Sequence, residues 1–184
     1  MTREELEQAI RAACDVADDA EVYVFGSQAI LGQYPDAPET LRQSAEADIA
    51  PVHAIDKLHL IDGSLGELSP FHHAFGFYVH GVGLEAAVLP RGWERRTIAV
   101  RNANTNYATG RCVEAHDLAA SKLVAWRERD REFVRSLLAE ELIDARKLLR
   151  RITQLPDDRR VPSGHREMMR EWIRGIVRDL GRAS

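Results

Sequence analysis

A chain of 184 residues with 45% hydrophobic residues is long enough to bury a core of its own, and it carries a formal net charge of −4. Its two cysteines, Cys14 and Cys112, stand far apart and in no metal-ligand spacing, which excludes a disulfide framework and a cysteine zinc site. The N-terminal segment is polar and acidic with no long apolar run, so the sequence predicts a cytoplasmic protein without a membrane segment.

The N-terminal part of the chain is expected to alternate between helix and strand. In chain order, the pattern predicts a helix over residues 3–15, a strand over 21–25, a short helix over 27–33 and a strand over 44–51. Ser27 is expected to cap the short helix directly after Gly26. The strand and the short helix therefore meet at a tight Gly-Ser turn.

The rest of the chain is expected to complete a sheet and then to become helical. Further elements are a helical pattern over 52–68, a loop over 68–76, strands over 77–82, 85–90 and 97–100, and helices over 116–127, 133–152 and 169–180. The predicted fold class is α/β (α+β), with a small mixed β-sheet flanked by helices and a C-terminal helical bundle. We expect a catalytic domain over residues 1–113 and a helical region over 114–184 that packs on the catalytic cleft.

Two acids on the second strand carry the chemistry. Side chains two residues apart on a strand project from the same face, so Ser44, Glu46 and Asp48 are expected to form one row. Two carboxylates on one face repel each other unless a cation lies between them. Mg²⁺ accepts one or two protein carboxylates and completes its shell with water and substrate phosphates. The pair therefore predicts a Mg²⁺ site for a metal-bound nucleoside triphosphate.

The Gly-Ser turn is expected to face this metal site. Gly26 lets the backbone approach a phosphate closely, and Ser27 offers its hydroxyl and the amides of the following helix start. Together with Glu46 and Asp48, this arrangement resembles the DNA polymerase β-like nucleotidyltransferase superfamily. The resemblance implies two metal ions and attack of a hydroxyl on the α-phosphate of the triphosphate, with pyrophosphate as the leaving group.

A narrower resemblance is to AbiE-type toxin nucleotidyltransferases and small bacterial relatives. It is carried by the segments GSQAILGQYPDAP, LRQSAEADI, GSLGELSPFH, AVLPRGW and HDLAASKLVAWRERD. It implies nucleotide transfer to RNA, typically the acceptor end of tRNA, in a toxin-antitoxin setting with a cognate antitoxin protein as partner. The same resemblance implies that Lys122 is functional and that Arg127 and Asp130 lie near the pocket.

Several assignments stay open at this point. The superfamily generally has a third acid on a later strand as the base for the hydroxyl, and Glu85 is the only acid available in the expected central strands. Arg42 is as well explained by a phosphate contact as by a plain surface charge. The histidines His72, His73 and His80 lack the spacing of a zinc site, so a structural role is favoured for them.

The distribution of charge along the chain is relevant to which molecule accepts the nucleotide. Residues 141–184 hold eleven Lys and Arg against seven Asp and Glu, a balance of +4, whereas the first 140 residues hold 14 against 22, a balance of −8. The basic part includes arginines spaced every four residues, namely Arg166, Arg170, Arg174, Arg178 and Arg182. Such a stripe suits an RNA backbone, although a solvated helix face explains it more simply.

Two alternatives to RNA modification remain. The first is transfer of AMP to a protein, as in minimal nucleotidyltransferases. The second is a catalytically inactive nucleotidyltransferase fold that binds RNA or a partner. Glu46 stands where Asp is more usual in the superfamily, and the gap between Ser27 and Glu46 is longer than its common form, which keeps the second alternative open.

Overall fold

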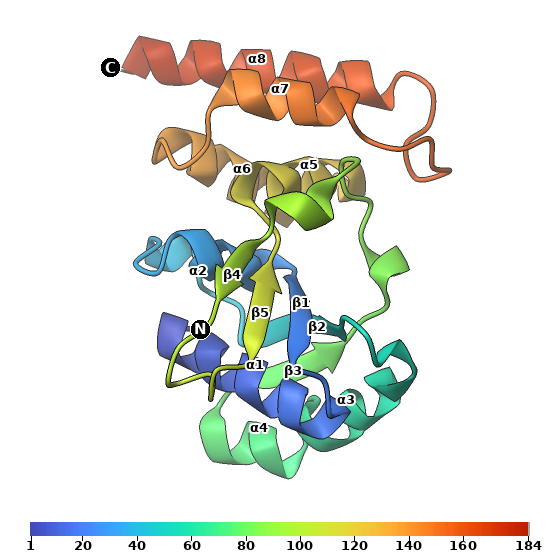
Figure 1. Cartoon of the computed structure of the whole chain (residues 1–184). Coiled ribbons are helices and arrows are strands. Elements are labelled where there is room, and N and C mark those ends of the chain that lie inside the picture. The colour runs from blue at the N-terminus through green and yellow to red at the C-terminus, as the bar shows by residue number, and fades with distance from the viewer. Residues whose placement is uncertain (184) are drawn as a thin grey trace. The chain divides into compact units, whose positions relative to one another are not determined.

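A five-stranded mixed sheet forms the centre of the first of two units in the chain (Figure 1). The computed structural model describes residues 1–183, and the surroundings of side chains up to residue 181. The first unit comprises Met1–Ala86 and Glu94–Glu114, and the second comprises Ala87–Trp93 and the chain from Ala115 onward. With eight α-helices in the described chain, the fold is the mixed α/β class that the sequence predicted.

The sheet joins strands from distant parts of the sequence in the order β3-β2-β1-β5-β4. The strands are β1 (Glu21–Phe25), β2 (Glu46–Pro51), β3 (Tyr78–Gly81), β4 (Ile98–Val100) and β5 (Thr109–Cys112). β2 runs antiparallel to β1 and parallel to β3, whereas β5 runs parallel to β1 and antiparallel to β4. The acid-bearing strand β2 therefore lies between the Gly-Ser strand and β3.

Four helices belong to this unit. They are α1 (Arg3–Ala17), α2 (Ile30–Gln33), α3 (Leu58–Leu65) and α4 (Pro70–Phe75). A capping box starts α1, because the Thr2 hydroxyl accepts from the Glu5 amide and the Glu5 carboxylate accepts from the Thr2 amide. α1 packs against β1, β2 and β5, and α3 packs against β3 and α1. Fully buried residues such as Leu6, Ile10 and Ile49 form the core.

The expectation of a loop over residues 68–76 was wrong, because α4 occupies most of it. Ser69 caps α4 by accepting a hydrogen bond from the His72 amide, and Pro70 stands at the first helical position, where its missing N–H costs nothing. Gly76 ends the helix in the left-handed conformation, with φ of +77°. Each of these start and stop signals was present in the sequence.

The expectation of a strand over residues 85–90 was also wrong. Leu84–Ala86 forms a 3₁₀ helix, and the following Val88 and Leu89 are buried without joining the sheet. A short apolar run next to a proline reads equally well as a buried connection. The sheet instead gains β5, which the sequence did not predict because Gly110 weakens its strand pattern.

The second unit is helical. It contains α5 (Ala115–Ala125), α6 (Glu128–Ala139), α7 (Ala145–Thr153) and α8 (His165–Ala183). The single helix expected over 133–152 is two helices, because Glu141 adopts a positive φ of 55° and Asp144 caps a new helix by accepting from the Lys147 amide. None of the described helices is both long and apolar enough to cross a bilayer.

Candidate functional site

Glu46 and Asp48 share one face of β2, as their spacing predicted. They alternate with Ala47 and Ile49, which are fully buried, whereas the carboxylate side chains are 37% and 30% exposed. The alternation leaves both acids at the surface of the unit on a strand fixed from both sides by β1 and β3. Ser44 does not extend this row, because β2 begins only at Glu46.

The Gly-Ser turn lies directly against Asp48. Phe25 pairs with Asp48 in the β1–β2 register, and a Cβ placed on Gly26 would lie 2.2 Å from Asp48 Oδ2. Gly26 also has a φ of +63°, which L side chains rarely adopt. Glycine is thus required here twice, once by the backbone and once by the carboxylate that occupies the space of a side chain.

Ser27 begins a 3₁₀ helix, Ser27–Ala29, instead of capping it. The N-cap position belongs to Gly26, and no side-chain hydrogen bond caps the turn, so the expectation of a Ser27 cap was wrong. The next residue, Gln28, is fully buried, and neither polar atom of its amide has a hydrogen-bond partner in the described chain.

Ser44 and Arg42 lie on the approach to β2. The Ser44 hydroxyl accepts a hydrogen bond from the Glu46 amide at 3.0 Å, so it fixes the backbone of the acid-bearing strand where the strand starts. Arg42 is half-buried, and its Nε has no hydrogen-bond partner within the described residues. Leaving a buried donor of this kind without a partner costs free energy.

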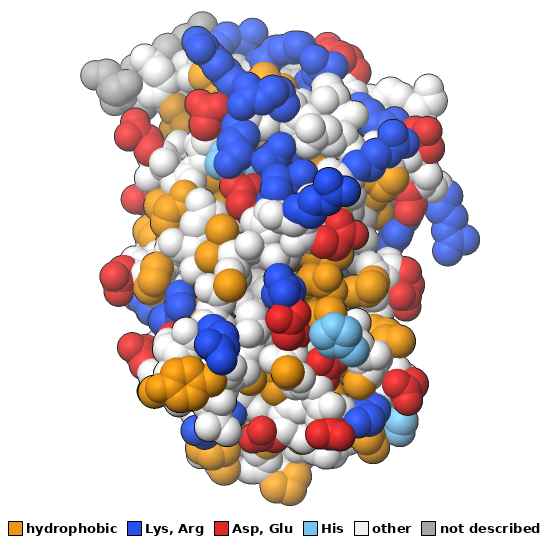
Figure 2. Space-filling view, in the orientation of Figure 1, with side chains coloured by type: hydrophobic (Ala, Val, Ile, Leu, Met, Phe, Trp, Pro, Cys, Tyr) orange, Lys and Arg blue, Asp and Glu red, His pale blue; other side chains and the backbone are white. Residues whose placement is uncertain are grey.

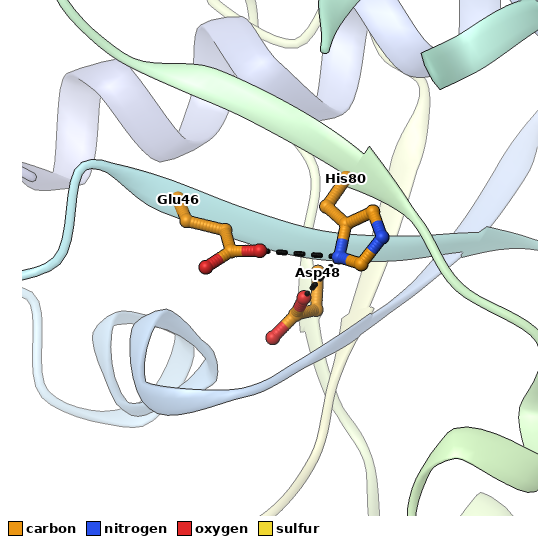
Figure 3. A group of neighbouring side chains, drawn as sticks. All are labelled: Glu46, Asp48 and His80. Atoms are coloured by element: carbon orange, nitrogen blue, oxygen red, sulfur yellow. Dashed lines mark hydrogen bonds and ion pairs between the residues drawn. The ribbon is translucent and has the colours of Figure 1, made fainter. Parts of the chain in front are cut away.

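His80 on β3 joins the two acids (Figure 3). Its Nδ1 lies 3.1 Å from Glu46 Oε1 and 3.3 Å from Asp48 Oδ1. One ligand atom from each of the three residues lies within 4.8 Å of the others, which makes this trio the candidate metal site in the described part of the chain. Sequence spacing missed His80, because 32 residues separate it from Asp48 and only the β2–β3 pairing places it opposite.

Tyr78 stands beside Glu46 in the same pairing and forms a hydrogen bond with its carboxylate. Burial, together with the nearby carboxylates, raises the pKa of Tyr78, so its phenol stays protonated as the donor. A pocket of about 350 Å³ opens next to these side chains. Its lining consists of Glu46, Asp62, Gly66, Glu67, Tyr78 and His80.

Glu85 is not placed as its sequence suggested. It lies on the exposed 3₁₀ helix Leu84–Ala86, and its carboxylate folds back to within 2.2 Å of where a Cβ of Gly83 would stand. Among the described residues, the group of potential metal ligands around Asp48 includes His80 and not Glu85. The role of Glu85 as base stays a prediction, now without the strand that motivated it.

Lys122 and Asp130 belong to the second unit and contact each other. Lys122 Nζ lies 3.2 Å from Asp130 Oδ1 and 4.7 Å from the centre of the Phe133 ring. Both charged side chains are largely buried, and Asp130 Oδ2 has no partner within the described residues. Arg127 is exposed at the N-cap of α6 and makes no capping hydrogen bond through its side chain.

Some arginines of the stripe on α8 form hydrogen bonds or ion pairs within the second unit. Arg166 binds the carbonyl oxygens of Leu155 and Pro156, and Arg174 pairs with Glu167 at 3.2 Å. Arg178 is exposed, whereas the side chain of Arg182 lies outside the described residues. The stripe is therefore only in part a free basic surface.

The two thiols take no part in this chemistry. Cys14 and Cys112 are both buried, and burial raises the pKa of each to about 12. A thiol of this kind stays protonated at neutral pH and is a poor nucleophile.

A model of a protein family described as nucleotidyltransferase of unknown function (DUF6036) matches residues 4–172. The chain belongs to this family. The match confirms the nucleotidyltransferase resemblance at the level of the superfamily, and the family description indicates a transferase that uses a nucleotide substrate. No curated protein and no solved structure matches the chain.

In this chain, the trio on β2 and β3 fits a divalent ion. Its donors are two carboxylates and an imidazole, and the missing Cβ of Gly26 gives Asp48 Oδ2 the room to turn toward the Gly-Ser loop. The fit to a divalent ion follows from the donor atoms of Glu46, Asp48 and His80 and from the space at Gly26.

Proposed function

We propose that the chain transfers a nucleoside monophosphate from a nucleoside triphosphate to an acceptor hydroxyl, with Glu46 and Asp48 holding a divalent metal. The contact between Gly26 and Asp48 carries this proposal, because it brings the Gly-Ser turn and a carboxylate of the proposed metal site to one place. Two carboxylates alone favour Mg²⁺. A bound divalent ion supplies charge stabilisation to the phosphate oxygens during transfer.

The chain's own residues would position the triphosphate. Gly26 and Ser27 let the phosphates approach the backbone, and the half-buried Arg42 contributes a positive charge on the approach to β2. Ser44 acts indirectly, since its hydroxyl fixes the Glu46 backbone. By the toxin resemblance, Lys122 offsets phosphate charge with Arg127 and Asp130 nearby; this part of the proposal rests on the α5 and α6 sequence.

The preferred acceptor is RNA, specifically the tRNA acceptor end, in a toxin role that a cognate antitoxin protein would control. The preference comes from the resemblance to AbiE-type toxins. It is supported by the +4 balance of residues 141–184 and by the Lys and Arg side chains gathered over α7 and α8 in Figure 2. Among the described side chains of α7 and α8, the exposed arginines are Arg146, Arg150, Arg174 and Arg178. Such a surface attracts a phosphate backbone without reading its sequence.

One observation favours a protein acceptor instead. The pocket beside the metal site is lined by the carboxylates of Glu46, Asp62 and Glu67 and by no lysine or arginine of the described chain. A hydroxyl next to a basic side chain suits this lining better than a polyanion does. The alternative is therefore transfer of AMP to a serine, threonine or tyrosine of a basic protein segment.

Incubation with α-labelled triphosphates, total RNA and cell lysate separates the two acceptors. The RNA proposal predicts label in RNA, concentrated in the tRNA fraction, and none in protein. Label found only in protein would show that the acceptor is a protein and not RNA. Label in neither, with RNA still bound, would favour the inactive binding module.

The same assay tests the proposed metal ligands. Asp48→Asn is expected to lower transfer at least about 100-fold, because a metal-binding carboxylate contributes several kcal/mol to charge stabilisation. Asp56→Asn is the matched control, since Asp56 is an exposed acid of the same unit outside the trio. Equal activity in the two variants would remove Asp48 from the proposed site.

A further inference from the structure

The pairing of β2 with β3 places an imidazole where only carboxylates were expected. Asp48 is the register partner of His80, and Glu46 is the partner of Tyr78. Parallel neighbours in register put these side chains on the same face of the sheet. The Nδ1 of His80 thus reaches both acids, as Figure 3 shows.

An ion pair alone is a weak reason for this arrangement. The His80 side chain is 50% exposed, and an exposed pair contributes little to stability. The arrangement does more as a ligand set: three donor atoms from two rigid strands converge within 4.8 Å. The shape of the site is also supported from outside, since Tyr78 binds the Glu46 carboxylate and Gly26 leaves room for Asp48 Oδ2.

We infer that His80 is the third protein ligand of the divalent ion, and that the mixed imidazole–carboxylate set selects Mn²⁺ over Mg²⁺. The inference deepens the proposed function, since it concerns the metal of that same site.

The selectivity follows from donor chemistry. Mg²⁺ is a hard ion that prefers oxygen ligands and gives up its waters reluctantly, so a nitrogen donor adds little to its binding. Mn²⁺ accepts carboxylates and also gains from imidazole, and it keeps the octahedral geometry that leaves positions for phosphate oxygens. His80 is therefore expected to raise the affinity for Mn²⁺ while leaving the affinity for Mg²⁺ nearly unchanged.

Pulsed electron paramagnetic resonance of Mn²⁺ tests the ligand directly. The full chain is stripped of metal with a chelator and loaded with Mn²⁺ alone, without nucleotide or acceptor. Coordination by His80 predicts ¹⁴N modulation in the wild type and its loss in His80→Gln and His80→Asp. His73→Gln is the matched control and is expected to keep the modulation, because His73 is exposed on α4 outside the trio.

Mn²⁺ titration of the same proteins tests selectivity. His80→Gln is expected to weaken Mn²⁺ binding at least about tenfold, since loss of a residue that merely supports a metal ligand already costs that much. His80→Asp restores an all-oxygen set, so Mg²⁺ should displace Mn²⁺ at a lower concentration in this variant than in the wild type. Circular dichroism checks that each variant is folded.

Three results would overturn the inference. They are no Mn²⁺ binding to the wild type, binding without ¹⁴N modulation, and modulation that persists in His80→Gln. Because no nucleotide is present, the outcome is separate from that of the transfer assay. Modulation without any transfer would keep His80 as a ligand and reject the proposed reaction, whereas transfer without modulation would do the reverse.

Discussion

At the level of single residues, the candidate site requires a glycine at position 26, because the Asp48 carboxylate lies where a side chain at that position would begin. Asp48 Oδ2 occupies the volume that a Cβ of residue 26 would need, and the φ of Gly26 suits no other residue. The sequence predicted that Gly26 and Asp48 would belong to one site. It gave no indication that the two residues would touch.

Gly26→Ala should therefore disturb both the backbone and the metal site. We expect a loss of about 1–3 kcal/mol in the free energy of unfolding from the strained φ. Weaker metal binding should accompany it, because Asp48 must move. Urea unfolding and Mn²⁺ titration measure the two effects. Gly63→Ala on α3 is the matched control: a Cβ there meets no described atom within 4 Å, so a gain of up to about 1 kcal/mol is expected. Equal behaviour of the two variants would contradict the contact.

Asp19 is expected to make the stability of the fold depend on pH. Asp19 is buried, and burial by itself would raise its pKa, but hydrogen bonds from His53, Glu21 and Ala54 lower it to about 2. The ordinary value is 3.8, so the carboxylate stabilises the fold fully above about pH 4. This contribution is lost as the pH falls through the folded-state value of about 2.

Asp19→Asn is thus expected to lower the free energy of unfolding by about 2 kcal/mol at pH 7, since each pKa unit corresponds to about 1.4 kcal/mol. The difference from the wild type should shrink steadily below pH 4. Urea unfolding across pH 2–7 measures it. The neighbouring Asp18 is the control, because its side chain is 96% exposed and Asp18→Asn should change stability little. A pH-independent difference would show that ionisation of Asp19 is not its source.

At the scale of elements, the close packing of α1 on β5 explains an unusual strand. The three atoms nearest to a Cβ built on Gly110 all belong to Ile10, at 2.3 to 3.3 Å. Ile10 is fully buried on α1. The lack of a side chain at Gly110 therefore allows α1 to pack closely on β5. The same glycine weakens the strand pattern of residues 109–112, so the sequence did not predict β5.

A double-mutant cycle tests this packing. Gly110→Ala should destabilise the protein by about 1–3 kcal/mol through overpacking. Ile10→Ala should cost about 2–5 kcal/mol through the cavity it leaves. The double variant should lose less than the sum, since each change relieves the other. The control pair is Gly110→Ala with Leu6→Ala, which leaves a cavity elsewhere on α1. The two losses of stability in this pair should add. Equal coupling energies in the Ile10 pair and the Leu6 pair would refute the contact between Gly110 and Ile10.

The α5–α6 pair offers a structural explanation for Lys122. Its ammonium group neutralises the buried Asp130, so Lys122→Ala leaves a buried charge and should cost about 3 kcal/mol. A loss of transfer in that variant alone does not distinguish catalysis from folding. Lys122→Met with Asp130→Leu removes both charges and is expected to restore most of the stability. If Lys122 contacts the phosphates, this double variant should be folded and still inactive; recovered transfer would assign Lys122 to structure alone.

Local patterns determined most of the elements that could be predicted. β1 was recognisable from its β-branched and aromatic residues, and β2 from the alternation of polar and apolar residues. β3 and β4 were recognisable as short runs between turns, and α1 from its amphipathic spacing. The misses have physical causes. α4 is a short helix whose caps outweigh its weak periodicity, and the break between α6 and α7 depends on one residue with positive φ.

At the scale of the whole molecule, the site divides into what sequence spacing can reveal and what only the topology can. The Gly-Ser turn and the acid pair follow from residues close together in the chain. His80 and Tyr78 reach the site through the β2–β3 register, which no local pattern encodes. A basic C-terminal region and an acidic pocket in the first unit then favour different acceptors, so the identity of the acceptor has to be measured.

In the proposed reaction, Glu46 and Asp48 support transfer of the α-phosphate of a nucleoside triphosphate. The most direct measurement follows label from α- and γ-labelled triphosphate in parallel, with lysate and RNA as acceptors and with Mn²⁺ or Mg²⁺ present. We expect α-label to become bound to a macromolecule and γ-label to leave as pyrophosphate, and we expect chelator, or Glu46→Gln with Asp48→Asn, to abolish both. Transfer of γ-label, or α-label transfer that survives in the double variant, would contradict it.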